Sequence, residues 1–177
     1  MMASLVDRMV RAAKLDINLY EEVEADKSAM GQAITVVVLS SVASGIGTIA
    51  VLGIQGLIIG TISALLGWFV WAFLVYIIGT KLLPEPQTKS DMGELLRTIG
   101  FSSSPGVLRV FGFIPFLGAI ISIVVNVWML VAMIIAVRQA LDYKSTWRAI
   151  GVCVIGFVIY VAIIAVIFAV LGVPETM

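Results

Sequence analysis

A polar break interrupts a weakly apolar stretch of the chain at residues 102–105. Ser102, Ser103 and Ser104 stand together there and are followed by Pro105. Proline removes one helical hydrogen bond, and serine hydroxyls can satisfy the carbonyl groups that it frees. We therefore interpret the break as a structural kink. The alternative is a solute-binding site, because broken helices present unpaired backbone groups to substrates in many transporters.

Two further polar side chains, Arg109 and Asn126, lie beside or inside apolar runs and could contribute to such a site. A lone amide at mid-membrane depth needs a hydrogen-bond partner, so Asn126 is expected to face the other helices. Arg109 is expected one helical turn from the membrane surface, where a long side chain can reach the headgroups. Acidic residues, which couple proton or sodium transport, are missing from the apolar runs. Passive conduction is therefore favoured over coupled transport.

Trp68 and Trp71 stand with Phe69 and Phe73 in the middle of an apolar run, and Trp128 lies at a similar depth in a later one. Tryptophan usually gathers at the membrane–water interfaces rather than at mid-span. Core packing is our first interpretation of these rings. A flat hydrophobic ligand or a neighbouring membrane subunit bound against them is the alternative.

The residue inventory argues against most catalytic chemistry. The sequence contains no histidine, the usual general base and commonest zinc ligand, and its single cysteine, Cys153, lies in an apolar run. It also contains no Ser/His/Asp set and no phosphate-binding glycine loop. We therefore predict no catalytic residue, no metal and no cofactor. The 11 basic and 11 acidic residues balance to a net charge of zero, which does not favour nucleic-acid binding.

The composition predicts a membrane protein. Hydrophobic residues make up 61% of the chain, charged residues 12%, and the mean hydropathy is +1.13. A soluble domain carries about 25% charged residues. A water-soluble fold could not bury this much apolar surface, so the lipid bilayer is the first partner that we predict.

Three uncharged runs, 28–80, 110–137 and 149–174, predict four membrane-crossing helices. The first run is long enough to cross a roughly 30 Å hydrocarbon core twice, with a turn at Gly53–Gly56. The predicted spans are 32–52, 56–80, 115–138 and 148–172.

Segment 94–112 is the difficult one, because it contains Arg97, Arg109 and the polar break. Basic residues cluster before the first span, before this segment and around the loop at 138–148. If the segment crosses the bilayer, all three clusters face the cytoplasm, as the positive-inside rule requires. The sequence therefore predicts an all-α bundle of five spans within residues 31–173. Its N-terminus is cytoplasmic, and a short tail at 174–177 lies outside.

Residues 1–30 form the predicted cytoplasmic segment, which begins with an amphipathic helix. Apolar residues recur at helical spacing, and charged residues occupy the positions between them. The apolar set is Leu5, Val6, Met9, Val10 and Ala13, and the polar set is Asp7, Arg8, Arg11 and Lys14. Such a helix either lies on the bilayer surface or docks on a partner. The acidic residues at 21–26 are interpreted as a solvated face rather than a metal site.

This layout resembles the Yip-type domain (Ypt/Rab-interacting protein domain). The matching residues are Gly100, Phe101 and Pro105, which form a Gly-aromatic-x-x-x-Pro element, and the stretch from Tyr20 to Asp26. The resemblance implies five close-set spans after a short cytoplasmic region. Eukaryotic members are Golgi and endoplasmic-reticulum proteins that bind small GTPases and shape or sort transport vesicles. The short N-terminal region is similar to that of prokaryotic members, which implies a prokaryotic inner or plasma membrane.

From these features we expect a non-enzymatic membrane protein that acts through protein contacts. It would serve as an accessory or scaffold subunit of a membrane complex, or organise the bilayer. The alternative is a small transporter or channel with its site at the broken third span.

Overall fold

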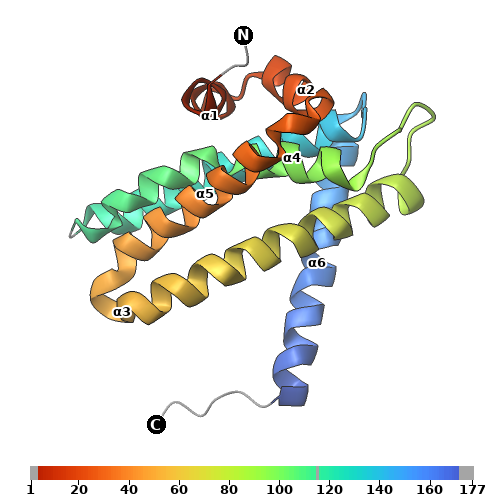
Figure 1. Cartoon of the computed structure of the whole chain (residues 1–177). Coiled ribbons are helices and arrows are strands. Elements are labelled where there is room, and N and C mark those ends of the chain that lie inside the picture. The colour runs from red at the N-terminus through yellow and green to blue at the C-terminus, as the bar shows by residue number, and fades with distance from the viewer. Residues whose placement is uncertain (1–3, 115, 172–177) are drawn as a thin grey trace.

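The computed structural model describes residues 4–114 and 116–171, and at 48–52, 168 and 171 it describes the backbone alone. Every regular element within these residues is a helix. Figure 1 shows their arrangement. The elements are α1 (Leu5–Ala13), α2 (Ile17–Ala25), the 3₁₀-helix η1 (Lys27–Ala29), α3 (Met30–Ile77), the π-helix η2 (Ile78–Leu82), α4 (Met92–Ser102), the 3₁₀-helix η3 (Ser104–Phe113), α5 (Leu117–Ala140) and α6 (Thr146–Leu171).

The long helix α3 is folded back on itself at Gly53, so that its two halves form a hairpin (Figure 1). Gly53 has φ 62° and ψ −170°. Only glycine adopts this backbone conformation readily, because any Cβ would clash with the neighbouring peptide groups. The turn predicted at Gly53–Gly56 is therefore a break at one glycine, and helix resumes directly after it.

Four helical stretches are long and apolar enough to cross a membrane, which confirms a helical membrane bundle. They are Lys27–Gly47, Gly53–Leu82, Leu117–Ala140 and Thr146–Ile167. The more polar α4–η3 segment is not among them. It packs between α3 and α5, and its rise of about 37 Å, from 1.5 Å per α-helical and about 2 Å per 3₁₀ residue, is enough to cross a membrane core of roughly 30 Å. A fifth span at 94–112 stays a prediction.

The two loops at 83–91 and 141–145 meet at one end of the bundle, here called the loop end. The backbone N–H of Lys144 donates to Glu85 Oε2 at 3.0 Å, and Gln87 Nε2 donates to the carbonyl of Asp142 at 2.9 Å. Helix α4 begins at this end. The side chains of Asp91 and Glu94 form a reciprocal capping box that stabilises its first turn.

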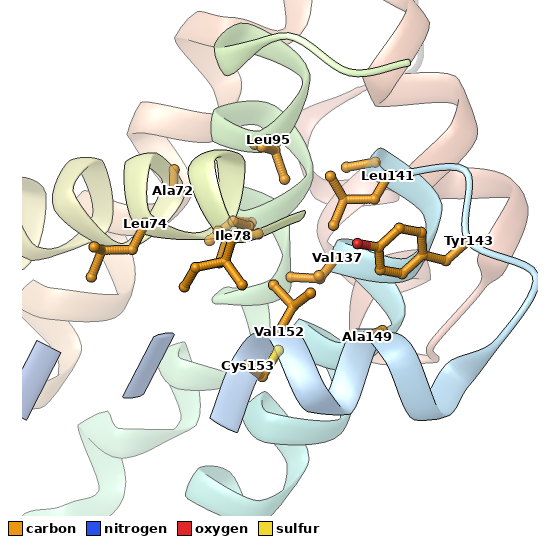
Figure 2. Packing of buried hydrophobic residues seen from close by; sticks show 13 residues of the cluster. Ala72, Leu74, Ile78, Leu95, Val137, Leu141, Tyr143, Ala149, Val152 and Cys153 are labelled. Carbon is orange, nitrogen blue, oxygen red and sulfur yellow. The ribbon is translucent and has the colours of Figure 1, made fainter. Parts of the chain in front are cut away.

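A hydrophobic cluster joins α3, α4, α5 and α6 near the loop end (Figure 2). Leu95 of α4, Val137 of α5 and Val152 of α6 are fully buried in it. Cys153 belongs to the same cluster, so it is a small buried hydrophobic residue, as the sequence indicated. The cluster involves only the first part of α6, and the rest of that helix extends away from the other helices (Figure 1).

The N-terminal segment, residues 5–29, docks on the helices of its own chain. The indole Nε1 of Trp128 in α5 donates to the carbonyl of Ala13 at 2.7 Å. Arg97 of α4 donates to the carbonyls of Val23 and Glu24, which satisfies the C-terminal end of α2. The sequence predicted that the amphipathic helix, α1, lies on the bilayer surface or docks on a partner. Docking on helices of the same chain was not among these predictions.

The expected polar face of α1 is wrong at one position. Arg8 is only 4% exposed, because it points toward α2 and donates to Glu22, Asp26 and Gln32 at 2.9, 2.7 and 3.0 Å. Val6, on the predicted apolar face, is 68% exposed and does not take part in the docking. A pattern of residue types could not show this, because three polar partners outside the helix decide which way Arg8 faces.

Candidate functional site

A seam of small residues lets η3 and α4 lie against the first half of α3. Ala33, Ser40 and Gly47 are seven residues apart, so they lie on one face of α3. A Cβ on Gly106 would stand 1.9 Å from Ser40 Oγ, and one on Gly47 would stand 2.5 Å from the carbonyl oxygen of Arg109. At Gly47 a real Cβ would force the two backbones apart, whereas at Gly106 the Ser40 side chain would have to shift.

This seam was not predicted from the sequence, although the spacing of seven between Ala33, Ser40 and Gly47 is visible there. Gly100, named in the family resemblance, belongs to it, since its Cβ would meet Ala33 Cβ at 2.9 Å. The other two resemblance residues, Phe101 and Pro105, are buried nearby. These three residues therefore have a packing role in the structure.

The polar break at residues 102–105 is where α4 ends and η3 begins. Ser102 Oγ donates to the carbonyl of Ile99, and Ser104 Oγ donates to the carbonyl of Phe101, each at 2.7 Å. Ser102 and Ser104 are buried, whereas Ser103 lines a cavity. Two of the three serines thus donate their hydroxyls to the backbone of the helix itself, and of the three only Ser103 lines a cavity.

Arg109 and Asn126 are brought together across η3 and α5. The Nη2 of Arg109 donates to Asn126 Oδ1. They line a cavity of about 550 Å³ at the end where η3 turns into α5, here called the polar cavity. Its described lining residues are Ser44, Gly47, Arg109, Gly112, Phe113, Ile114, Phe116, Gly118, Ala119, Ser122 and Asn126.

A second cavity of about 250 Å³, the inner cavity, lies between the two halves of α3 and is also lined by Arg109. Trp68, Trp71 and Ser103 line it as well. The Nε1 of Trp68 donates to the carbonyl of Leu96 at 3.2 Å, so this indole joins α3 to α4. Arg109 thus contributes to the lining of both cavities.

Trp71 lies where the inner cavity approaches an apolar groove of about 350 Å³ between α5 and α6. Its Nε1 lies 3.3 Å from Met133 Sδ, and its ring meets Tyr160 edge to face with centroids 6.4 Å apart. The two tryptophans proposed as a ligand surface therefore have packing partners of their own. The groove beside Trp71 is lined by apolar side chains.

An acidic hollow lies at the loop end, under the N-terminal segment. It is lined by Glu21 and Glu24 of α2, Glu94 of α4, Asp142 of the last loop and the cations Arg138 and Lys144. Burial, reinforced by the carboxylates of Asp142, Glu94 and Glu21, raises the pKa of Glu24 from 4.5 to about 7, against the opposing effect of Arg97.

We expect the docking of the N-terminal segment to weaken as the pH rises from about 5 to about 8. A carboxyl group whose pKa is raised by folding favours the folded state while protonated, and this stabilisation is lost as the pH passes from 4.5 to about 7. Glu24→Gln should remove the pH dependence and slow opening at pH 8. Hydrogen exchange of the α1 and α2 amides, corrected for intrinsic rates, measures this.

Asp7→Asn is the matched control for this experiment, because Asp7 is an exposed carboxylate of the same segment. The Asp16, Glu22 and Asp26 carboxylates have lowered pKa values, so they stay ionised across this pH range and do not mask the effect. Exchange that is independent of pH in the unmodified protein would contradict the prediction.

These arrangements can bind ions and polar groups, but they assemble no catalytic set among the described residues. No group of three or more His, Cys, Asp or Glu side chains in the described part of the chain is placed to hold a metal ion. What the site offers is a guanidinium, an amide and hydroxyl groups around the polar cavity.

The long apolar helices and the packed bundle define an integral membrane protein of the all-helical class, with the lipid bilayer as its environment. A family model described as the Yip1 domain matches residues 19–167, and the chain belongs to the Yip1 domain family. No curated protein and no solved structure matches the chain. The matched region begins inside α2 and ends inside α6, so it includes the seam and both cavities.

Proposed function

We propose that the protein is a non-enzymatic membrane scaffold or accessory subunit, or an organiser of the bilayer, that acts through protein contacts. The observation that carries the proposal is the outer part of α6. From Val161 onward this helix extends away from the bundle, and its described side chains, mostly apolar, are exposed on all sides.

One face of this projecting part suits close helix contact. Ala162, Ala165 and Ala169 follow one another at intervals of three and four residues, so they share a face, and all three are exposed. Helix association in lipid depends on van der Waals packing, and small residues let two backbones approach. Trp147, 82% exposed at the start of α6, is of the type that anchors a helix at the membrane interface.

The proposal predicts that the protein purified in a gentle detergent retains a membrane-protein partner, seen by mass analysis of the intact complex. Ala165→Phe should release that partner, because the larger side chain separates the two helices. Ile167→Phe adds a comparable ring on the opposite side of α6 and should leave the complex intact. A clean monomer without a partner, or equal loss in both variants, would overturn the proposal.

In this proposal the protein lies in a prokaryotic inner or plasma membrane, and the clusters of basic residues support a cytoplasmic N-terminus and an exterior C-terminus. The predicted tail at 174–177 lies outside the described residues. A reporter fused after Met177 that proves cytoplasmic would contradict the orientation.

A small passive conductor is the second candidate, because Arg109 lines both the polar cavity and the inner cavity. A conductor should give solute flux in liposomes, and that flux should fall in the Asn126→Ala and Pro105→Ala variants. A scaffold should give no flux.

A further inference from the structure

We propose that the polar cavity binds the phosphate group of a phospholipid. The guanidinium of Arg109 lines this cavity. Among the described residues its one hydrogen-bond partner is the neutral amide of Asn126. None of the described residues lining the cavity is an aspartate or glutamate, so the positive charge has no counterion there.

A partly buried guanidinium without a counterion favours binding of an anion. Arginine presents five N–H donors in a planar fork that matches phosphate oxygens, and the bond to Asn126 uses one of them. The hydroxyl of Ser122 lines the same cavity from α5 and adds a second kind of donor. A phosphate group is therefore complementary to this lining in both charge and hydrogen bonding.

The size and rim of the polar cavity favour a lipid over a free ion. Its volume of about 550 Å³ exceeds what one small ion needs and falls within the range of about 300–1,000 Å³ that small-molecule sites occupy. Phe113 and Phe116 stand at its rim, 64% and 96% exposed. An apolar rim of this kind suits a headgroup that enters from the bilayer.

The adjoining face of α5 can accommodate the acyl chains. Ile120, Ile123 and Val127 are exposed apolar residues that follow one another at helical intervals from the cavity lining. A lipid with its phosphate at Arg109 would lay its chains along this face, away from the turn between η3 and α5. The site lies at the opposite end of the bundle from the loop end, in or beside which stand Lys81, Lys89, Arg138, Lys144 and Arg148.

The test measures thermal stabilisation of the delipidated protein in detergent by three added probes. These are phosphatidylglycerol, a diacylglycerol with the same acyl chains and no phosphate, and inorganic phosphate. Phosphatidylglycerol should stabilise the protein and the diacylglycerol should not. Arg109→Gln should weaken the apparent affinity for phosphatidylglycerol about tenfold, since a charge-assisted contact is lost. Arg148→Gln, an exposed arginine of the loop end, should change it less than twofold.

A second variant avoids the risk that Arg109→Gln fails to fold. Ser122→Leu narrows the polar cavity and removes one hydroxyl while keeping both Arg109 and Asn126, and it should also weaken stabilisation by phosphatidylglycerol. Ser63→Leu is the matched control, because Ser63 is exposed on the second half of α3 and lines neither cavity. Its response should equal that of the unmodified protein.

The probes also separate the two sources of the anion. Stabilisation by phosphatidylglycerol alone, weakened in both cavity variants, identifies the lipid headgroup. An equal, Arg109-dependent effect of inorganic phosphate would support the anion site and assign it to a soluble phosphate. Equal effects of phosphatidylglycerol and diacylglycerol, or unchanged binding in Arg109→Gln and Ser122→Leu, would overturn the proposal.

Discussion

Arg8→Met is expected to release the N-terminal segment from the bundle while the membrane helices stay folded. Arg8 is almost fully buried and donates to Glu22 and Asp26, whose side chains are 33% and 27% exposed. Removing one member of a buried ion pair costs about 3–5 kcal/mol, and partial exposure of the two carboxylates reduces this to about 2 kcal/mol here. Hydrogen exchange of the α1 and α2 amides should accelerate about 30-fold, since 1.4 kcal/mol is a factor of ten.

Lys14→Met is the control, because Lys14 is an exposed cation at the end of the same helix. Acid provides an independent test of the network. Hydrogen bonds from Ser28 and then Arg8 lower the pKa of Asp26 from 3.8 to about 2. Its stabilising contribution is present above pH 4 and is lost as the pH falls toward 2. An Arg8→Met variant that exchanges as slowly as Lys14→Met would contradict this account.

Gly47→Ala is expected to destabilise the bundle by about 1–3 kcal/mol, the usual cost of forcing an extra methyl group into a packed site. The new Cβ would stand 2.5 Å from the carbonyl oxygen of Arg109, and a backbone atom cannot rotate away as a side chain can. The first half of α3 must therefore separate from η3. We expect a lower midpoint in thermal or detergent-induced unfolding followed by circular dichroism.

Gly60→Ala is the matched control, because a Cβ on Gly60 meets nothing within 4 Å. It should be neutral or stabilise slightly, by about 0.5–1 kcal/mol, since alanine loses less conformational freedom than glycine in a helix interior. Gly47 also lines the polar cavity, so Gly47→Ala should impair lipid binding along with stability. Similar midpoints for the two variants would show that the seam is not tightly packed.

Much of the fold could be predicted from composition and charge, because the bilayer imposes simple requirements. A helix that crosses it needs a long uncharged run, and the structure has helices in the runs 28–80, 110–137 and 149–174. The break near Gly53 was also predictable, because Gly53 and Gly56 lie inside an uncharged run long enough to cross the bilayer twice, which needs a turn. These features depend on local sequence and solvent, and not on which helices meet.

The structure of the α4–η3 segment could not be predicted in the same way from composition and charge. Its hydropathy is ambiguous because other helices, rather than lipid, surround much of it: Thr98, Ser102 and Ser104 are buried against neighbours. The flagged pair of Arg109 and Asn126 does meet, but sequence alone could not show that a cavity opens beside them. Both facts depend on the distance between α3 and α5.

The sequence by itself determined that this is a helical membrane protein, with uncharged runs in the bilayer, a polar break at residues 102–105 and a Yip1-type element around it. Only the tertiary structure decided which polar groups became buried, which glycines pack backbone against backbone, and where cavities remain. The physical reason is that insertion of a helix into lipid depends on the hydrophobicity and length of that one segment. A buried Arg8, the seam at Gly47 and the polar cavity at Arg109 each depend on partners far along the chain.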